Sequence, residues 1–387
     1  MLRTRLLPII GVLLLPASPA LPASPPATLP SAAFNTNEGT VNLDTVMRLT
    51  FDRNAEILTA RERVNESQIA LDAAIRSCWP EMLRKDTFKK PVAETTVWRR
   101  RAELRKVEND NLQDASNTYF DWLTTLRGEA VGQDLLTKEE KLLTRARKLA
   151  ETEKPVQVVV EAIETVVTGQ RQNILQTHQQ SEAVAAKLAY LMGINGGVLI
   201  TAETLQPIDR VDISAPVEVL VRQAQDNGPG VRELQGLIAS IEQGIAAACR
   251  AQRCCARTGA PLICARLQMA QSQLQQAQLS LLNLQLKLRA GVVDAFTEIL
   301  SGREQLDLAS KAIDHAKETY RIMELRVTEE SPDAAMRNKT YDGVLNSIRQ
   351  LAQAQSNYLS AVRDYDKAQV RLLLFLGTYS ECPTNAH

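Results

Sequence analysis

The sequence predicts an all-α protein made of long antiparallel coiled-coil helical hairpins, arranged as two internal repeats with little or no β structure. Aromatic residues make up only 4% of the 387 residues, while Ala, Leu, Gln, Glu and Arg dominate long stretches. This composition is typical of helices packed side by side. Apolar residues also recur at heptad spacing, and the two halves of the chain align onto each other.

The internal repeat sets the expected domain organisation. Residues 43–76 align without gaps onto residues 217–250, and both halves end in an apolar run followed by glycine. We therefore expect a first helical repeat over 41–214, a second over 215–378 and a short tail over 379–387. Because a repeated unit has one architecture, each half should contain the same series of helices.

Breakers and heptads give the expected helices. Asn54 and the pair Gly228-Pro229 interrupt the pattern early in each half, and Gly193 and Gly377 suit helix stops. The expected bounds are 43–52, 55–78, 99–153 and 157–193 in the first half, and 217–226, 229–250, 265–329 and 337–377 in the second. In each half the second and fourth helices together match the third in length, so they should stack end to end beside it. The chain then forms four rods.

The long helix of the second half carries the clearest coiled-coil pattern. One heptad series is followed, after a shift of four residues, by a second one. The first series is Leu267, Leu274, Leu281 and Leu288, and the second is Val292, Ile299, Leu306, Ile313, Tyr320 and Val327. Heptads specify a left-handed supercoil, which an insertion of four residues locally unwinds. The same spacing also suits a simple dimeric coiled coil, because it reports packing and not function.

The N-terminus has the features of a secretory signal peptide over residues 1–23. Arg3 and Arg5 precede an apolar segment, Leu6 to Leu15, that is too short to cross a bilayer, and small residues follow it. A short membrane anchor is the alternative. Residues 24–40 are rich in Pro, Ser and Ala and predict a disordered linker.

Export permits disulfides, so the cysteines predict a covalent staple. Cys78 lies where a helix of the first half meets an irregular segment, and three cysteines occupy the matching region of the second half. We expect a disulfide from Cys78 to Cys254, Cys255 or Cys264. Structural zinc sites favour short C-x2-4-C pairs, and this cluster lacks a second such pair and a nearby His, so no metal site is expected. Unpaired thiols are the remaining alternative.

The inventory of reactive residues argues against an enzyme. The three histidines, His178, His315 and His387, do not pair with a nucleophile or a metal cluster by spacing. No glycine-rich phosphate loop is present, so the chain is not expected to be an ATPase itself. No cofactor is expected. The 45 basic and 45 acidic residues balance, which leaves no positive field for nucleic acid.

Four segments resemble the TolC family of outer-membrane efflux proteins. They are VNLDTVMRLTFDRNAEILTARERVNESQIALDAA, RRRAELRKVENDNLQDASNTYFDWL, APVEVLVRQAQDNGPGVRELQGLIASIEQGIAAA and YDGVLNSIRQLAQAQSNYLSAVRDYDKAQVRLLLFLG. The resemblance covers residues 41–378. It implies a homotrimer of four-rod subunits that forms a helical tunnel across the periplasm for efflux. It also implies association with the outer membrane of a Gram-negative-type bacterium, an inner-membrane pump and a periplasmic adaptor.

The sequence departs from the family at two places. Each family half inserts two transmembrane β-strands, but here the segments 80–97 and 250–264 are too short for two strands of about 9–11 residues. The first segment is also crowded with charges. The β-barrel insertions are therefore expected to be shortened or missing. The family's adaptor-docking turns usually carry a glycine, and neither tip has one here. A barrel-less periplasmic coiled-coil scaffold or adaptor without channel activity is the second hypothesis.

The tips of the hairpins are acidic. They carry Glu151 and Glu153 in the first half, and Glu329, Glu330 and Asp333 in the second. In a trimer each residue would form a ring of three carboxylates, which makes these residues a candidate periplasmic gate that favours cationic cargo. The alternative is that they only solvate exposed turns.

Overall fold

The structure, a computed structural model, describes most of the chain between residues 41 and 378. The described residues are 41–81, 89–151, 157–195, 199, 201, 203–254, 260–328 and 334–378. Of these, residues 77–81, 89, 157–158, 250–254, 260–264, 328 and 334–338 are described by their backbone alone. The predicted signal peptide, linker and tail, and the turns around Pro155 and Pro332, lie outside the described residues.

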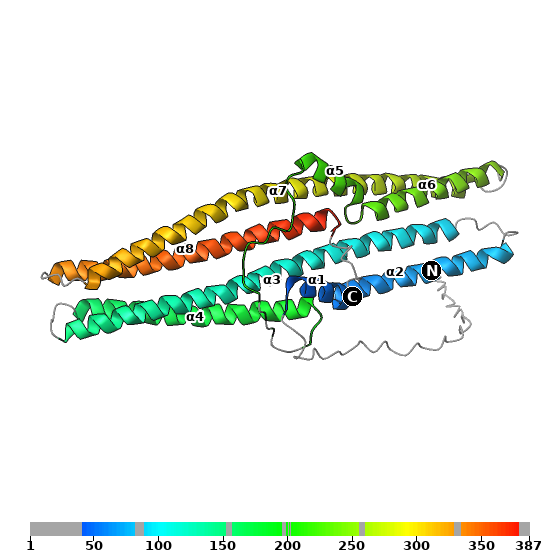
Figure 1. Cartoon of the computed structure of the whole chain (residues 1–387). Helices are drawn as coiled ribbons and strands as arrows, with labels where there is room; N and C mark the ends of the chain where they lie inside the picture. Colours follow the sequence, from blue (N-terminus) through cyan, green and yellow to red (C-terminus); the bar gives the residue numbers. More distant parts are fainter. Residues whose placement is uncertain are drawn as a thin grey trace, which may run out of the picture. The chain divides into compact units, whose positions relative to one another are not determined.

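Helices make up most of the described residues, and no strand occurs among them, which confirms the all-α prediction (Figure 1). The first half contains α1 (Leu43–Arg53), α2 (Ala55–Glu81), α3 (Lys89–Ala150) and α4 (Gln157–Leu191). The second half contains α5 (Val217–Asn227), α6 (Val231–Cys254), α7 (Ala260–Thr328) and α8 (Ala334–Phe375). The order of a short, an intermediate, a long and a return helix occurs twice.

Both long helices begin earlier than the sequence predicts. The helix α3 starts at Lys89 instead of Arg99, and α7 starts at Ala260 instead of Ala265. The expected irregular stretch over 80–97 is therefore wrong for most of its length. Pro91 lies in the first turn of α3, where no intrahelical donor is needed, so it helps to begin the helix and does not interrupt it.

Each long helix packs along two shorter ones. The helix α3 contacts α2 and α4, and α7 contacts α6 and α8, so the stacked pairs run beside the long helices as expected (Figure 1). Contacts of α3 with α6 and α8 join the two halves. The short helices α1 and α5 pack against α3 and α7.

Asn54 links α2 to α4 at the joint of the first stacked pair. Its Oδ1 accepts hydrogen bonds from the backbone N–H groups of Glu56 and Ile57, at 2.9 and 3.3 Å, and so caps the start of α2. Its Nδ2 donates to the carbonyl of Leu191, the last residue of α4, at 3.0 Å. One buried side chain thus satisfies backbone groups at two helix ends, which otherwise lack intrahelical partners.

Glycines end both return helices, as predicted. Gly193 follows α4 with a φ of +65°, and Gly377 follows α8 with a φ of +73°. At Gly193, a Cβ atom would lie 2.4 Å from the carbonyl oxygen of Arg53, at the end of α1. At Gly377, the nearest atom would be the carbonyl oxygen of Asn227, at 3.0 Å. Each return helix therefore ends against the short helix of its own half.

The core consists of apolar clusters distributed along the rods. One cluster joins α1, α3, α4 and α8 around Tyr119, and a second joins α5, α7 and α8 around Ile299. A third lies near the hairpin tips around Ile163. Trp98 packs against a small fourth cluster. It also lies close to Gly236, where an added Cβ atom would be 2.6 Å from the indole ring of Trp98. Trp98 is thus part of a packed contact, and the side chain of Trp79 lies outside the described residues.

The substitution Gly193→Ala should destabilise the protein. A left-handed backbone and a contact of 2.4 Å both penalise a methyl group, so we expect a loss of roughly 2 kcal/mol or more of unfolding free energy. Gly169→Ala is the control, because a Cβ at this position in α4 meets nothing within 4 Å. It should stabilise the helix by about 0.5–1 kcal/mol. Equal thermal midpoints for the two variants would contradict this account.

Candidate functional site

A long groove runs between α3, α6 and α7. It consists of two hollows, of about 740 and 830 Å³, that share Arg99, Ile241 and Gln273 as lining residues. Because the hollows share these residues, they form one continuous feature, which we call the interhelical groove. It is built from both halves of the chain.

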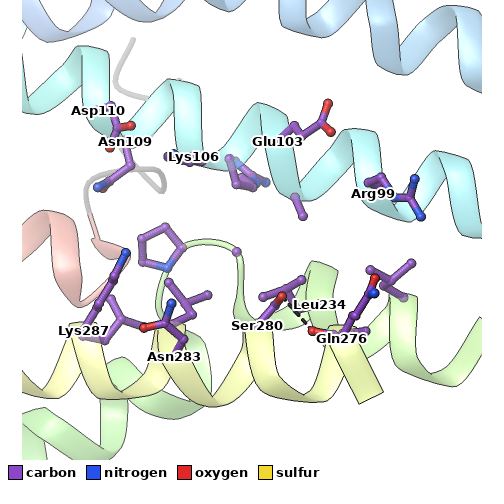
Figure 2. A pocket seen from close by; sticks show the side chains of 18 of the residues that line it. Arg99, Glu103, Lys106, Asn109, Asp110, Leu234, Gln276, Ser280, Asn283 and Lys287 are labelled. Atoms are coloured by element: carbon purple, nitrogen blue, oxygen red, sulfur yellow. Dashed lines mark hydrogen bonds between the residues drawn. The ribbon is translucent and has the colours of Figure 1, made fainter. Parts of the chain in front are cut away.

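The floor of the interhelical groove is apolar and its rim is polar. Leu237, Ile241 and Leu288 are buried in the floor. Figure 2 shows polar side chains of α3 and α7 on the two walls, with the apolar Leu234 between them. The labelled polar residues are Arg99, Glu103, Lys106, Asn109 and Asp110 on α3, and Gln276, Ser280, Asn283 and Lys287 on α7. The arrangement suits a molecule that is apolar on one part and polar on another.

The rim carries an excess of positive charge. Among the described residues, Arg99, Lys106 and Lys287 make no ion pair within 4.0 Å. Glu103 is neutralised by Arg100 outside the groove, at 2.7 Å. Burial raises the pKa of Asp110, a shift that Lys106 and Lys287 partly oppose and that Asp114 increases. The two lysines therefore lie near enough to Asp110 to act on its charge, and they remain available to an anion.

A second, polar groove of about 620 Å³ lies between α3, α7 and α8. Most of its charged side chains are in ion pairs: Lys367 binds Asp121 at 2.6 Å, and Arg371 binds Asp294 at 3.2 Å. Because most of its charges are neutralised within the chain, this groove offers less attraction to a charged ligand than the interhelical groove does.

The segment between the two halves is held against α8 by buried polar side chains. Gln369, which is fully buried, accepts from the backbone N–H of Arg210 at 2.6 Å and donates to the carbonyl of Ile208 at 2.7 Å. Asp366 accepts from the N–H of Ile208 at 3.2 Å. Burial raises the pKa of Asp366 to about 7, against the opposing effects of this hydrogen bond and of Arg210. The tyrosine Tyr365 adds a hydrogen bond to Asp209.

Glu139 is a buried acid on α3. Its side chain is 1% exposed, and among the described residues its Oε2 atom has no hydrogen-bond partner. Burial raises the pKa of this carboxyl to about 7, and Arg349 of α8 opposes the shift. The heptad pattern did not indicate that Glu139 is buried, because the sequence of a long helix does not distinguish one buried acid from an exposed one.

The sequence-predicted site residues are only partly described. Glu151 is exposed in the turn after α3, whereas Glu153, Glu329, Glu330 and Asp333 lie outside the described residues. The side chains of Cys78, Cys254 and Cys264, and all of Cys255, also lie outside them, so the disulfide stays a prediction. Cys249, in α6, is half-buried and free.

Neither a metal-site cluster nor a membrane-spanning helix is found among the described residues. No group of three or more His, Cys, Asp or Glu side chains gathers there as a metal site requires. Over the same residues, no helix combines the length and the hydropathy needed to cross a membrane.

Several solved structures have a similar fold, and some of them are bacterial outer-membrane channels. A membrane protein from Pseudomonas aeruginosa is 13% identical, with a TM-score of 0.70 over 93% of this chain and 96% of that chain. The MtrE outer membrane channel of Neisseria gonorrhoeae, in its open state, is 12% identical, with a TM-score of 0.62 over 84% and 88% of the two chains. The outer membrane protein VceC of Vibrio cholerae is 12% identical, with a TM-score of 0.60 over 87% and 96%.

These likenesses confirm the TolC-like helical fold that the sequence resemblance implied. At identities of 11–14% they show the fold and not a shared activity. No family model matches the chain, and no curated protein matches it in sequence.

The substitution Glu139→Gln should change how stability depends on pH. Because the pKa of Glu139 is raised on folding, the folded state binds the proton more tightly than the unfolded state does. The protonated carboxyl therefore contributes its full stabilisation below 4.5, the pKa in the unfolded state, and this contribution is lost as pH rises through about 7. The variant should therefore be more stable than the wild type by about 2–3 kcal/mol near pH 8.5, and similar to it near pH 4. Asp366 titrates in the same range, so the pH dependence should flatten but not vanish.

Thermal midpoints across this pH range measure the effect. Glu140→Gln is the matched control, because it removes the neighbouring carboxylate, which is exposed and paired with Arg171 at 2.7 Å. A Glu139→Gln variant whose midpoint follows that of the wild type at every pH would contradict the buried-acid account.

Proposed function

We propose that this chain is the tunnel-forming component of a bacterial efflux or export system. Three copies would enclose a helical passage across the periplasm, associate with the outer membrane, and work with an inner-membrane pump and a periplasmic adaptor. The fold likeness over most of the chain supports this proposal. The observation that carries it is an unpaired apolar surface on α7.

The α7 stripe is a row of exposed apolar residues at heptad spacing. It consists of Leu279, Leu286, Val293 and Leu300, which are between 41% and 65% exposed. The helix α7 packs against α5, α6 and α8 through other residues, including Leu288, Val292 and Ile299. Four large apolar side chains in one row are more than scattered surface residues require, and heptad spacing is typical of a helix that packs against another helix.

A complementary edge belongs to α2 and α4. Ile69 on α2, and Leu175 and Tyr190 on α4, are also largely exposed. The α7 stripe and this edge are different surfaces, so copies that join through them make head-to-tail contacts. Such contacts close into a ring when the rotation between copies is right. A ring of helical layers is the arrangement that a tunnel requires.

The second candidate is a periplasmic scaffold or adaptor without channel activity. The connectors that replace the family's strand insertions support it, because α2 ends at Glu81 and α3 begins at Lys89, while α6 ends at Cys254 and α7 begins at Ala260. Each connector is shorter than a single membrane strand of about 9–11 residues. The two candidates differ in membrane association and conductance, and they share the predicted ring.

We further propose the acidic tips as a periplasmic gate. Glu151 is exposed at the end of α3, as a gate residue must be, and threefold symmetry would bring three copies of each tip acid together. Rings of carboxylates raise the local concentration of cations. The predicted disulfide from Cys78 to Cys254, Cys255 or Cys264 would join the two halves covalently at the ends that lie away from these tips.

Cell fractionation separates the two candidates. A tunnel component should co-purify with outer-membrane vesicles and resist extraction by salt, whereas a scaffold should stay in the soluble periplasmic fraction. Recovery of the full chain in the soluble fraction alone would reject the outer-membrane tunnel and favour the scaffold.

The double substitution Leu286→Glu/Val293→Glu should prevent assembly. It places two charges in the middle of the α7 stripe, where burial against a second copy would cost several kcal/mol. We expect the mass measured by light scattering to fall from that of the trimer to that of the monomer. Ser301→Glu is the control, because it adds a charge at an exposed position of the same helix that lines the polar groove. An unchanged mass for the double variant would rule out the stripe as the interface.

Neutralising Glu329, Glu330 and Asp333 together, as Gln, Gln and Asn, should lower cation selectivity in single-channel recordings or alter the efflux phenotype. The physical reason is the loss of up to nine carboxylates from a narrow ring of three subunits. If a conducting trimer keeps its selectivity and its phenotype after this change, the acids only solvate the turns.

A further inference from the structure

We propose that the interhelical groove binds a single-chain anionic amphiphile with a carboxylate head, such as a fatty acid. The inference goes beyond the proposed function, because the groove lies within one chain and needs neither a tunnel nor a second copy.

The charge of the rim selects an anion. Lys106 projects from α3 and Lys287 from α7, so they reach the groove from opposite walls (Figure 2). Both lysines act on the charge of Asp110, and a third cation, Arg99, lies further along the groove. Three cations that lack an ion pair among the described residues therefore meet one unneutralised acid. An anionic head between the two lysines would gain charge-assisted hydrogen bonds from both walls.

The floor accommodates an extended apolar chain. From the level of Lys106, the floor residues Leu234, Leu237 and Ile241 lead to the second hollow, whose lining includes Val92 and Met269. The last two side chains are each 64% exposed, so an apolar ligand would cover surface that the chain itself leaves open. From Lys106 back to Val92, helix α3 rises roughly 21 Å at about 1.5 Å per residue. The groove is therefore long and narrow, as one acyl chain requires.

The pattern of charge and burial disfavours other small ligands. A cation would meet the excess of positive charge at Arg99, Lys106 and Lys287. A small polar anion would leave the apolar floor unused, and burial of that floor supplies most of the available free energy, at about 25 cal/mol per Å². A molecule with both parts uses the lysines and the floor together.

The test is a competition experiment with the purified full-length chain in detergent-free buffer. The probe is a fluorescent fatty acid, dansyl-undecanoate, and the competitors are laurate and dodecyltrimethylammonium, used below their micelle concentrations. We expect laurate to displace the probe at least about tenfold more effectively than the cation of equal chain length, since one charge-assisted contact corresponds to about this factor.

Two variants locate the site. Lys106→Gln/Lys287→Gln should weaken laurate binding by about tenfold or more, because both lysines contact the head. Ser280→Trp fills the groove from an exposed position, and it should abolish binding with the helical circular dichroism signal unchanged. Lys311→Gln/Lys317→Gln is the matched control: it removes two lysines of α7 that are paired with Asp307 and Asp314 outside the groove, and it should bind as the wild type does.

Three results would overturn the proposal. They are an absence of probe binding to the wild type, equal displacement by laurate and by dodecyltrimethylammonium, and wild-type affinity in both groove variants. None of them bears on the tunnel, because assembly and conductance are measured separately. Loss of binding in the groove variants, with the control unaffected, would support the proposal whether the chain is a tunnel or a scaffold.

Discussion

The joint between α2 and α4 is the constraint on which the arrangement of the rods depends. Two shorter helices replace one long helix there, and their ends bring backbone groups without intrahelical partners into the interior. Asn54 satisfies groups at both ends, and Gly193 lets α4 finish against the carbonyl of Arg53. In the second half, Gly228 and Gly377 occupy the corresponding joint of α6 and α8. These joints allow each stacked pair to follow its long helix, so that the rods pack along their length.

The interhelical groove is a consequence of the same arrangement. Because α6 and α8 together lie beside α7, a break between them occurs at Gly228 and Pro229, where one helix has ended and the next begins. Pro229 lines the groove at this break, with Phe375 of α8 and Leu288 of α7. Apolar surface that a continuous rod would cover is left open there. The joint that orders the fold therefore also helps to create the amphipathic surface of the interhelical groove.

The buried polar groups place a limit on how far the rods can be treated as a simple coiled coil. Gln369 and Asp366 bind the backbone of the segment between the halves, and Glu139 lies among apolar residues near the tips. Such groups cost free energy unless they are paired or protonated. Asp366 fixes a specific backbone contact, whereas Glu139 ties part of the stability to pH. A uniform seam of leucines would do neither.

The sequence by itself determined the helices, because heptad spacing and glycine or asparagine breakers act over a few residues. It placed α1, α4 and α5 within two residues of their observed bounds, and it indicated the stops at Gly193 and Gly377. It missed the start of α3, since the charges around Pro91 have the pattern of a loop as well as that of a first helical turn. The groove could not be predicted at all. Lys106 and Lys287 are far apart in the chain, and only the packing of α3, α6 and α7 brings their charges to one apolar floor.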